Sequence, residues 1–425
     1  MEARPLDPYI TTPGGCQLAQ EYSLRTFLRK APNALLQSYL TERLGIEIPW
    51  HRLSETSVDE IITAIENAPE ASRRQAENAF RDIHDMADGN GRRLFIEEGR
   101  DSHHNVELAD ILDAKSGHLE CAFWVFLTHP AIFNVARRFH EADALPRPRK
   151  RDRLPSAEPN TDSETACRLG TAISGYYSHS EGRGYLCEVE HYRRQYRLYW
   201  FAYLSDYAQS NLTFNDDQQL EARTQRPAFQ IVFVYDPRER SLEITLKGDK
   251  RRLLDLQCIF GNVVLGVDLR QEDPSRVVYD LAPLIRRDFP FDLEPDDGVD
   301  VVSVKRLRLR VIGADNERIT LEAATKGNRN AVYDLLDRVV ASKQLPSGLM
   351  QVTSVTLSLA FRAQGQEPAR TVTLHVSTPD SCSLKHDPRH DHVRDLLKRW
   401  GIDVSGRPED DPADARRPVQ FTNRV

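Results

Sequence analysis

Residues 84–93 are the only stretch of the chain whose residue types and spacing match a catalytic signature. The Gly-Asn-Gly core at residues 89–91 would form a backbone concavity whose N–H groups face anionic oxygens. A structural interpretation uses the same residues. Residues 71–87 have the pattern of an amphipathic helix, and glycine and asparagine at residues 88–91 supply the positive φ of a helix C-terminal stop. We favour the structural stop and keep the catalytic loop as the alternative.

This stretch resembles the active-site loop of Fic-type nucleotidyl transferases. That loop runs His, any residue, Phe, any residue, Asp or Glu, Gly, Asn, Gly, Arg, two of any residue, Arg. The resemblance implies that His84 is the base that deprotonates a target hydroxyl and that Asp88 binds the magnesium ion on the phosphates of ATP. It also implies that Asn90 belongs to the phosphate-binding loop and that Arg92 neutralises charge on the leaving phosphate. Met86 stands where the family usually has Phe.

The composition is that of an ordinary soluble protein, with 40% hydrophobic and 28% charged residues in a chain of 425. This length exceeds a single compact core, so we expect two or three domains. The sequence has no run of about 18 apolar residues and no basic, apolar leader at its start. These features predict a cytoplasmic protein that does not enter the membrane. The formal net charge of -7 means that any surface for nucleic acid must be local.

Six cysteines are scattered without a Cys-x-x-Cys pair, which predicts free thiols rather than a zinc ribbon or a disulfide framework. Three histidines and two aspartates crowd into residues 386–392, but His390 and His392 lack the i, i+4 spacing of a helical metal pair. We therefore predict no metal site. We also predict no cofactor, and only the alternative catalytic loop would require ATP and magnesium.

The chain divides at a basic segment that contains proline. Residues 1–144 carry apolar side chains near the helical period, which predicts an N-terminal helical domain. Residues 145–170 begin with three prolines and five basic residues and continue as a polar stretch, so we interpret them as a linker. The tail, residues 405–425, is acidic and rich in proline, and we expect it to be disordered.

Residues 171–404 show the alternating pattern of β-strands, interrupted by amphipathic helices. Two strands followed by a helix occur three times, at residues 228–265, 301–341 and 352–400. This order implies a mostly antiparallel sheet with its helices on one face. The predicted fold class is therefore α+β, with an all-helical domain in front of a domain of repeated strand-strand-helix units.

One predicted strand presents a row of arginines. Over residues 305–311 the alternation places Arg306, Arg308 and Arg310 on one face and apolar residues on the other. Three guanidinium groups in line repel one another unless negative charge faces them. Acids on the neighbouring strand, Glu317 and Glu322, are the structural candidates for that charge. The functional candidate is a phosphate backbone.

A second predicted strand combines arginines with aromatic rings, among them Arg193, Arg197 and Tyr199. Rings for base stacking and cations for phosphates are what single-stranded nucleic acid requires. The same composition also builds a well-paired central strand whose arginines extend to the surface, and we favour that interpretation. These residues and the arginine row are our candidate nucleic-acid contacts.

We hypothesise a non-catalytic, cytoplasmic binding or regulatory protein that presents a sheet face to a macromolecular partner. Nucleic acid is favoured over protein as that partner because of the arginines. The alternative is a Fic-like AMP transferase centred on residues 84–93. If residues 145–170 are an exposed linker, limited trypsin digestion should cut first between Arg147 and Arg153 and release two soluble fragments.

Overall fold

The structure is a computed structural model of the 425-residue chain, divided into two compact units, residues 1–141 and 142–425. It describes residues 22–54, 57–100, 104–145, 148–215, 219–246, 250–270, 276–312, 317–343, 349–363 and 369–406. Within these residues, no helix is long and apolar enough to cross a membrane. Residues 407–425, most of the predicted acidic tail, lie outside the described residues.

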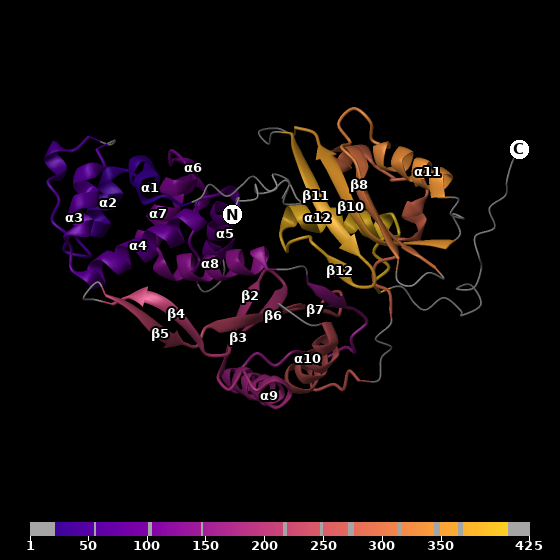
Figure 1. The fold of residues 1–425 in the computed structure, drawn as a ribbon, viewed down its shortest axis with the longest axis horizontal. Helices are drawn as coiled ribbons and strands as arrows, with labels where there is room; N and C mark the ends of the chain where they lie inside the picture. Colours follow the sequence, from indigo (N-terminus) through magenta and orange to yellow (C-terminus); the bar gives the residue numbers. More distant parts are fainter. Residues whose placement is uncertain are drawn as a thin grey trace, which may run out of the picture. The chain divides into compact units, whose positions relative to one another are not determined.

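The first unit is helical, as the apolar period predicted (Figure 1). Its elements are α1 (Leu24–Lys30), α2 (Asn33–Leu40), a 3-10 turn η1 (Trp50–Arg52), α3 (Asp59–Glu66), α4 (Glu70–Asp85), α5 (Gly89–Gly99), α6 (Ala109–Asp113), α7 (His118–Thr128) and α8 (Pro130–Ala144), whose last residues belong to the second unit. Aromatic rings form much of its core. Phe80 and Phe123 are fully buried with ring centroids 6.1 Å apart, and Phe27 lies 4.7 Å from Phe80.

The second unit is built on a ten-stranded sheet. Its strands are β1 (Arg149–Arg151), β2 (Cys187–Arg194), β3 (Arg197–Ser205), β6 (Ala228–Asp236), β7 (Ser241–Leu246), β8 (Val299–Val311), β9 (Arg318–Glu322), β10 (Met350–Phe361), β11 (Arg370–Ser377) and β12 (Ser381–Cys382). They lie in the order β2-β3-β6-β7-β1-β12-β11-β10-β8-β9. Every neighbouring pair is antiparallel. A separate two-stranded hairpin, β4 (Gln209–Phe214) and β5 (Leu220–Gln225), connects β3 to β6.

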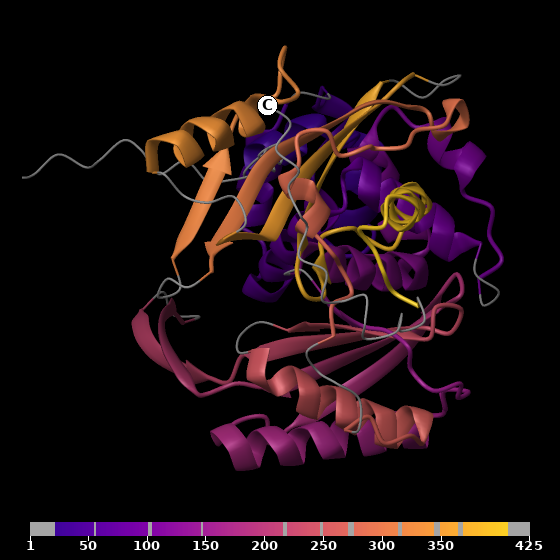
Figure 2. The ribbon, with the colours of Figure 1, turned by 90° about the vertical axis from the view of Figure 1, so that its right-hand side faces the viewer.

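Helices cover the sheet in two groups, each with its own apolar core. They are α9 (Ser163–Glu181), α10 (Leu253–Phe260), α11 (Ala331–Lys343) and α12 (Pro388–Arg399), with short helical turns η2 (Lys250–Arg252), η3 (Gly261–Leu265), η4 (Ala282–Ile285) and η5 (Pro295–Asp297). α9 and α10 pack on β2, β3, β6 and β7, as Figure 2 shows, while α11 and α12 pack on β8, β10 and β11. The three predicted strand-strand-helix units are confirmed as β6-β7-α10, β8-β9-α11 and β10-β11-α12.

The predicted linker is wrong for the part of it that the structure describes. Arg149 pairs with Ile244 of β7 on one side and with Ser381 of β12 on the other, so β1 connects the two halves of the sheet. α9 also begins inside the predicted linker, at Ser163. Acids from distant turns reduce the repulsion between the basic side chains, since Arg149 pairs with Asp380 at 2.5 Å and Lys150 pairs with Glu239 at 2.7 Å. Pro146 and Arg147 lie outside the described residues.

Candidate nucleic-acid interface

The alternation predicted for β8 is present in the structure. Leu307 and Leu309 are fully buried, whereas Arg308 and Arg310 are exposed on the opposite face. Arg306 shares that face and donates to the carboxylate of Glu322 on β9 at 2.6 Å. The predicted neutralisation by a neighbouring acid therefore occurs at one of the three arginines.

A fourth arginine joins the row from β9. The strand register places Arg318 directly opposite Arg310, and both side chains are exposed. Arg308 has Thr320 opposite it, and within the described segments no acid pairs with Arg308, Arg310 or Arg318. Like charges directly opposite each other destabilise a sheet. We call Arg306, Arg308, Arg310 and Arg318 the arginine face, and its positive charge is only partly compensated.

The arginine face continues as a polar surface on β10 and β11. Gln351 of β10 is the exposed neighbour of Arg310. Next to Arg308, Ser354 of β10 accepts a hydrogen bond from Ser377 of β11 at 2.9 Å. Hydroxyl, amide and guanidinium groups are the side chains that contact phosphate oxygens in nucleic-acid complexes. The surface can therefore hold a phosphate backbone.

The predicted contacts on β3 are wrong, because Arg197 and Tyr199 are each only 3% exposed. Arg197 binds the carboxylates of Asp236 at 3.2 Å and Asp391 at 2.8 Å, and burial raises the pKa of Tyr199 above its usual range. β3 is the well-paired inner strand that we favoured from the sequence, and its side chains cannot stack on bases. Arg193 is exposed on β2, at the opposite end of the strand order from the arginine face, so the structure does not bring the two groups together.

Ionisable residues that are distant in sequence lie buried or half-buried around β1, and we call Lys150, Glu239, Glu243, His386 and Arg394 the buried charge cluster. Lys150 exposes 4% of its side chain, with its Nζ 2.7 Å from Glu239 Oε2. Burial disfavours the charged amine, but the surrounding carboxylates raise the pKa of Lys150 to about 12. Burial likewise opposes the charge on Glu239, yet the amines of Lys150 and Lys398 lower its pKa to about 2. Both groups are therefore charged at neutral pH.

The second part of the buried charge cluster joins β7 to the segment before α12. Burial opposes the charge on Glu243, but His386 and Arg394 hold the pKa of its carboxyl well below the usual range. Burial lowers the pKa of His386 although Glu243 acts in the other direction, so the imidazole is neutral at pH 7. His386 Nε2 lies 3.0 Å from Glu243 Oε2 and must donate to it, because an ionised carboxylate only accepts. Arg394 donates to the carbonyl oxygen of Leu384 at 2.8 Å.

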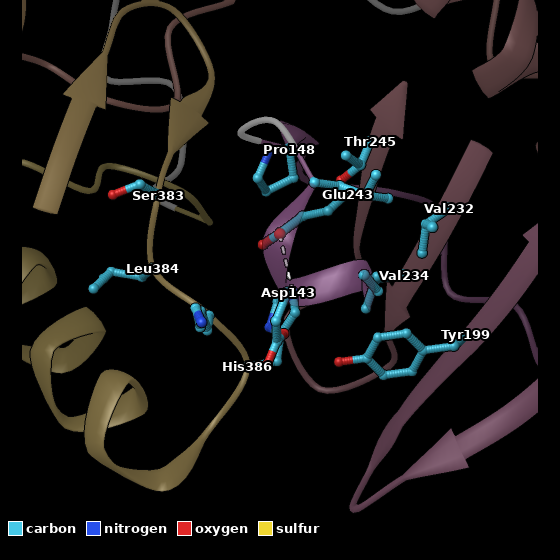
Figure 3. A pocket seen from close by; sticks show the side chains of 13 residues that line it. Asp143, Pro148, Tyr199, Val232, Val234, Glu243, Thr245, Ser383, Leu384 and His386 are labelled. Carbon is cyan, nitrogen blue, oxygen red and sulfur yellow. Dashed lines mark hydrogen bonds and ion pairs between the residues drawn. The ribbon is translucent and has the colours of Figure 1, made fainter. Parts of the chain in front are cut away.

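A cavity of about 80 Å³ lies beside Glu243 and His386 (Figure 3). It is lined by Ala142, Asp143, Leu145, Pro148, Tyr199, Val232, Val234, Glu243, Thr245, Ser383, Leu384, Lys385 and His386. Sites for small molecules usually measure roughly 300–1,000 Å³, and about 80 Å³ holds only a few water molecules. We therefore assign this region a structural role. The sequence feature that could have indicated the buried charge cluster is the charged residue Glu243 between the apolar Leu242 and Ile244 of one strand.

The loop at residues 84–93 ends one helix and begins the next, because α4 ends at Asp85 and α5 starts at Gly89. Asp88 is the N-cap of α5, and its carboxylate accepts a hydrogen bond from the N–H of Gly91 at 2.6 Å. The positive φ predicted for a helix stop at residues 88–91 is absent from this described segment. The predicted helix end is confirmed within two residues, but residues 88–91 start α5 instead of forming the stop, because aspartate is a preferred N-cap. Gly91 is required here, since a Cβ would collide with the carbonyl oxygen of Met86.

Polar side chains of this loop contact partners within the first unit. Arg92 pairs with Asp113, and Asn90 accepts a hydrogen bond from Arg93. The ring of His84 lies edge-on to that of Tyr22, with centroids 5.4 Å apart. Residues that the Fic resemblance assigns to nucleotide binding therefore already have contacts within the first unit. They take part in the capping and packing of α4 and α5.

The two charged regions of the second unit differ in what surrounds them. In the buried charge cluster Lys150 pairs with Glu239 and His386 pairs with Glu243, whereas the arginine face is exposed and carries excess positive charge. The arginine face is therefore the candidate interface. Comparison of the chain with models of protein families, with curated proteins and with solved structures gives no match.

Proposed function

We propose that the protein binds nucleic acid through the arginine face. The observation that carries this proposal is the direct pairing of Arg310 with Arg318, beside Arg308, with no acid among the described residues to neutralise the three. Holding like charges opposite each other costs stability, and a phosphate backbone across β8 and β9 would remove that cost. A non-catalytic binding role in the cytoplasm is consistent with this partner.

Backbone contacts, rather than base stacking, are the mode of binding that we propose. The side chains around the arginine face are hydroxyl and amide groups such as Ser354 and Gln351, while the aromatic rings of β3 are buried. Phosphate contacts position a nucleic acid without reading its sequence. We therefore expect similar affinity for duplexes of different sequence and a strong dependence on salt.

Charge reversal tests the proposal. We would change Arg308, Arg310 and Arg318 together to glutamate and measure the anisotropy of a labelled 20-base-pair duplex at low salt. Each lost phosphate contact costs on the order of 1 kcal/mol, so the affinity should fall about 100-fold or more. The matched control reverses three exposed arginines that pair with acids elsewhere, Arg270, Arg286 and Arg362, and so changes the net charge equally. An absence of binding by the unaltered protein, or equal losses in both variants, would overturn the proposal.

A second candidate function is the nucleotidyl transferase that the resemblance at His84 implies. The observation in its favour is that a packed helix follows the loop, since Leu94 and Phe95 of α5 are fully buried. We rank it second because the Asp88 carboxylate already fills the N–H site at Gly91. The test incubates labelled ATP and magnesium with the pure protein and a cell lysate. Label that disappears in a His84→Ala variant supports the activity, and label independent of His84 excludes it.

A further inference from the structure

The outer edge of β2 is available for another strand. β2 is the first strand in the sheet order and pairs only with β3. Among the described residues, no backbone hydrogen bond outside that ladder involves Cys187, Val189, His191 or Arg193, whose N–H and C=O groups point away from β3. The outward N–H and C=O groups of an eight-residue edge strand can therefore pair with an extended chain, which is how β-strand addition creates affinity.

A groove of about 500 Å³ runs between this edge and α9. It is lined by Thr161, Asp162, Ser163, Ala166, Cys167, Thr171, Cys187, Glu188, Val189 and His191. Gly170 explains the close approach of helix and strand, because a Cβ there would lie 3.2 Å from the carbonyl oxygen of Cys187. The volume is within the range of ligand sites and exceeds that of the cavity at His386.

The side chains of the groove indicate what an added strand should carry. Val189 and Cys187 point to the same side of β2 as α9, where Ala166 and Cys167 leave room for small apolar groups. Glu188 points to the other side and is exposed. Every residue of the lining that is charged at neutral pH is acidic, which favours a basic partner.

His191 supplies a further polar contact. Its Nε2 is buried and makes no hydrogen bond with any residue that the structure describes, and its ring lies 4.9 Å from that of Trp200. Burial lowers the pKa of His191, so the ring is neutral at pH 7 and one nitrogen can accept a hydrogen bond. A buried polar atom without a partner is uncommon, and a group supplied by a bound chain would satisfy it.

We propose that an extended segment of another protein, with alternating small apolar and basic side chains, adds as a strand to β2 and fills the groove against α9. The apolar side chains enter the groove, and a lysine or arginine lies beside Glu188. This surface is separate from the arginine face, so either proposal can fail without the other.

The probe is a fluorescein-labelled ten-residue peptide that alternates valine and lysine, compared with one in which glutamate replaces lysine. We expect the lysine peptide to bind the full chain at least tenfold more tightly. Binding should also slow hydrogen exchange at the backbone amides of β2, because its outward N–H groups become hydrogen-bonded. Stronger binding of the glutamate peptide, or no binding of either peptide, would overturn the proposal.

Two variants separate this site from general attraction to an acidic protein. Cys167→Trp fills the groove without a change of charge and should weaken binding at least tenfold, whereas His179→Trp, at an exposed site on α9 that does not line the groove, should not. Glu188→Lys should shift the preference towards the glutamate peptide. Equal affinity of the Cys167→Trp and His179→Trp variants for the lysine peptide would show that the groove is not the site.

Discussion

The buried charge cluster and the arginine face both concentrate charged side chains on one sheet, but they differ in how far opposite charges neutralise them. Around β1, Lys150 has Glu239 and Asp403 within 3.6 Å, and His386 donates to Glu243. On β8 and β9, Arg306 faces Glu322, but Arg308 faces a hydroxyl group and Arg310 faces Arg318. Buried charge has to be paired because its desolvation is costly, whereas exposed charge is screened by water and salt.

Because of this difference, we expect changes in the two regions to affect different properties of the protein. A change inside the buried charge cluster should alter the free energy of unfolding strongly, since it leaves a charge without a partner. A change on the arginine face should alter unfolding little and binding strongly.

The largest expected effect is the removal of the charge on Lys150. Lys150→Met keeps most of the apolar stem but leaves Asp403, which exposes 2% of its side chain, without its nearest cation. Breaking a buried pair in this way costs roughly 3–5 kcal/mol. Urea unfolding of the full chain should show this loss, while Arg308→Ala should change stability by no more than about 0.5 kcal/mol. Similar losses of stability in Lys150→Met and Arg308→Ala would show that the two regions do not differ in their contribution to stability.

Acid should destabilise the protein through the buried charge cluster. The pKa of Glu239 is lowered from 4.5 to about 2, so its contribution is present above about pH 4.5 and is lost as the pH falls towards 2. That contribution amounts to roughly 3 kcal/mol. We expect the free energy of unfolding to fall less between pH 5 and pH 3 in Glu239→Gln than in the unaltered chain. If the free energy of unfolding fell equally with pH in both proteins, Glu239 would not be a source of the acid sensitivity.

Limited trypsin digestion should show an effect of intermediate size. The first cleavage site that we expect from the structure differs from the one predicted from the sequence. The backbone of β1 is paired on both sides, whereas Arg223 is exposed on the two-stranded hairpin. Proteolysis requires local opening of the chain, which is harder at an inner strand. Mass spectrometry of a time course should detect cleavage after Arg223 before cleavage after Lys150. An initial cut after Lys150 would restore the linker interpretation.

The smallest expected effect is a gain in stability instead of a loss. Arg310→Glu places an acid opposite Arg318 in place of a like charge, and such a cross-strand pair contributes about 0.2–1 kcal/mol. The variant should be slightly more stable to urea than the unaltered protein and should bind duplex DNA more weakly. A lower stability would mean that Arg310 already has a favourable partner, and the excess charge of the arginine face would be smaller than we infer.

Local patterns allowed much of the fold to be predicted. Alternation over residues 305–311 placed Leu307 in the core and Arg308 on the surface, as observed. The three strand-strand-helix units were also recognisable, because each is formed by residues close in sequence. β1 could not be recognised in this way. Its basic residues resemble a solvated linker until acids more than 80 residues away, such as Glu239, are known to pair with them.

Predictions of individual site residues were less successful for the same reason. Arg197 and Arg308 have similar sequence surroundings, an arginine among apolar residues of a strand. Only the tertiary structure shows that Asp391, 194 residues away, binds Arg197, and that no described acid binds Arg308. At residues 84–93 the residue types favour both the end and the start of a helix. Both occur, since α4 ends at Asp85 and the Asp88 carboxylate caps the start of α5 through the N–H of Gly91.

The dependence of duplex binding on salt tests the central claim most directly. A protein that neutralises three phosphates should show a slope of about −2.7 in log K against log salt, and replacement of Arg308, Arg310 and Arg318 by glutamine should remove most of it. Anisotropy titrations of both proteins from 50 to 200 mM salt measure these slopes. The account predicts a steep slope for the unaltered chain and a shallow one for the variant, and equal slopes would contradict it.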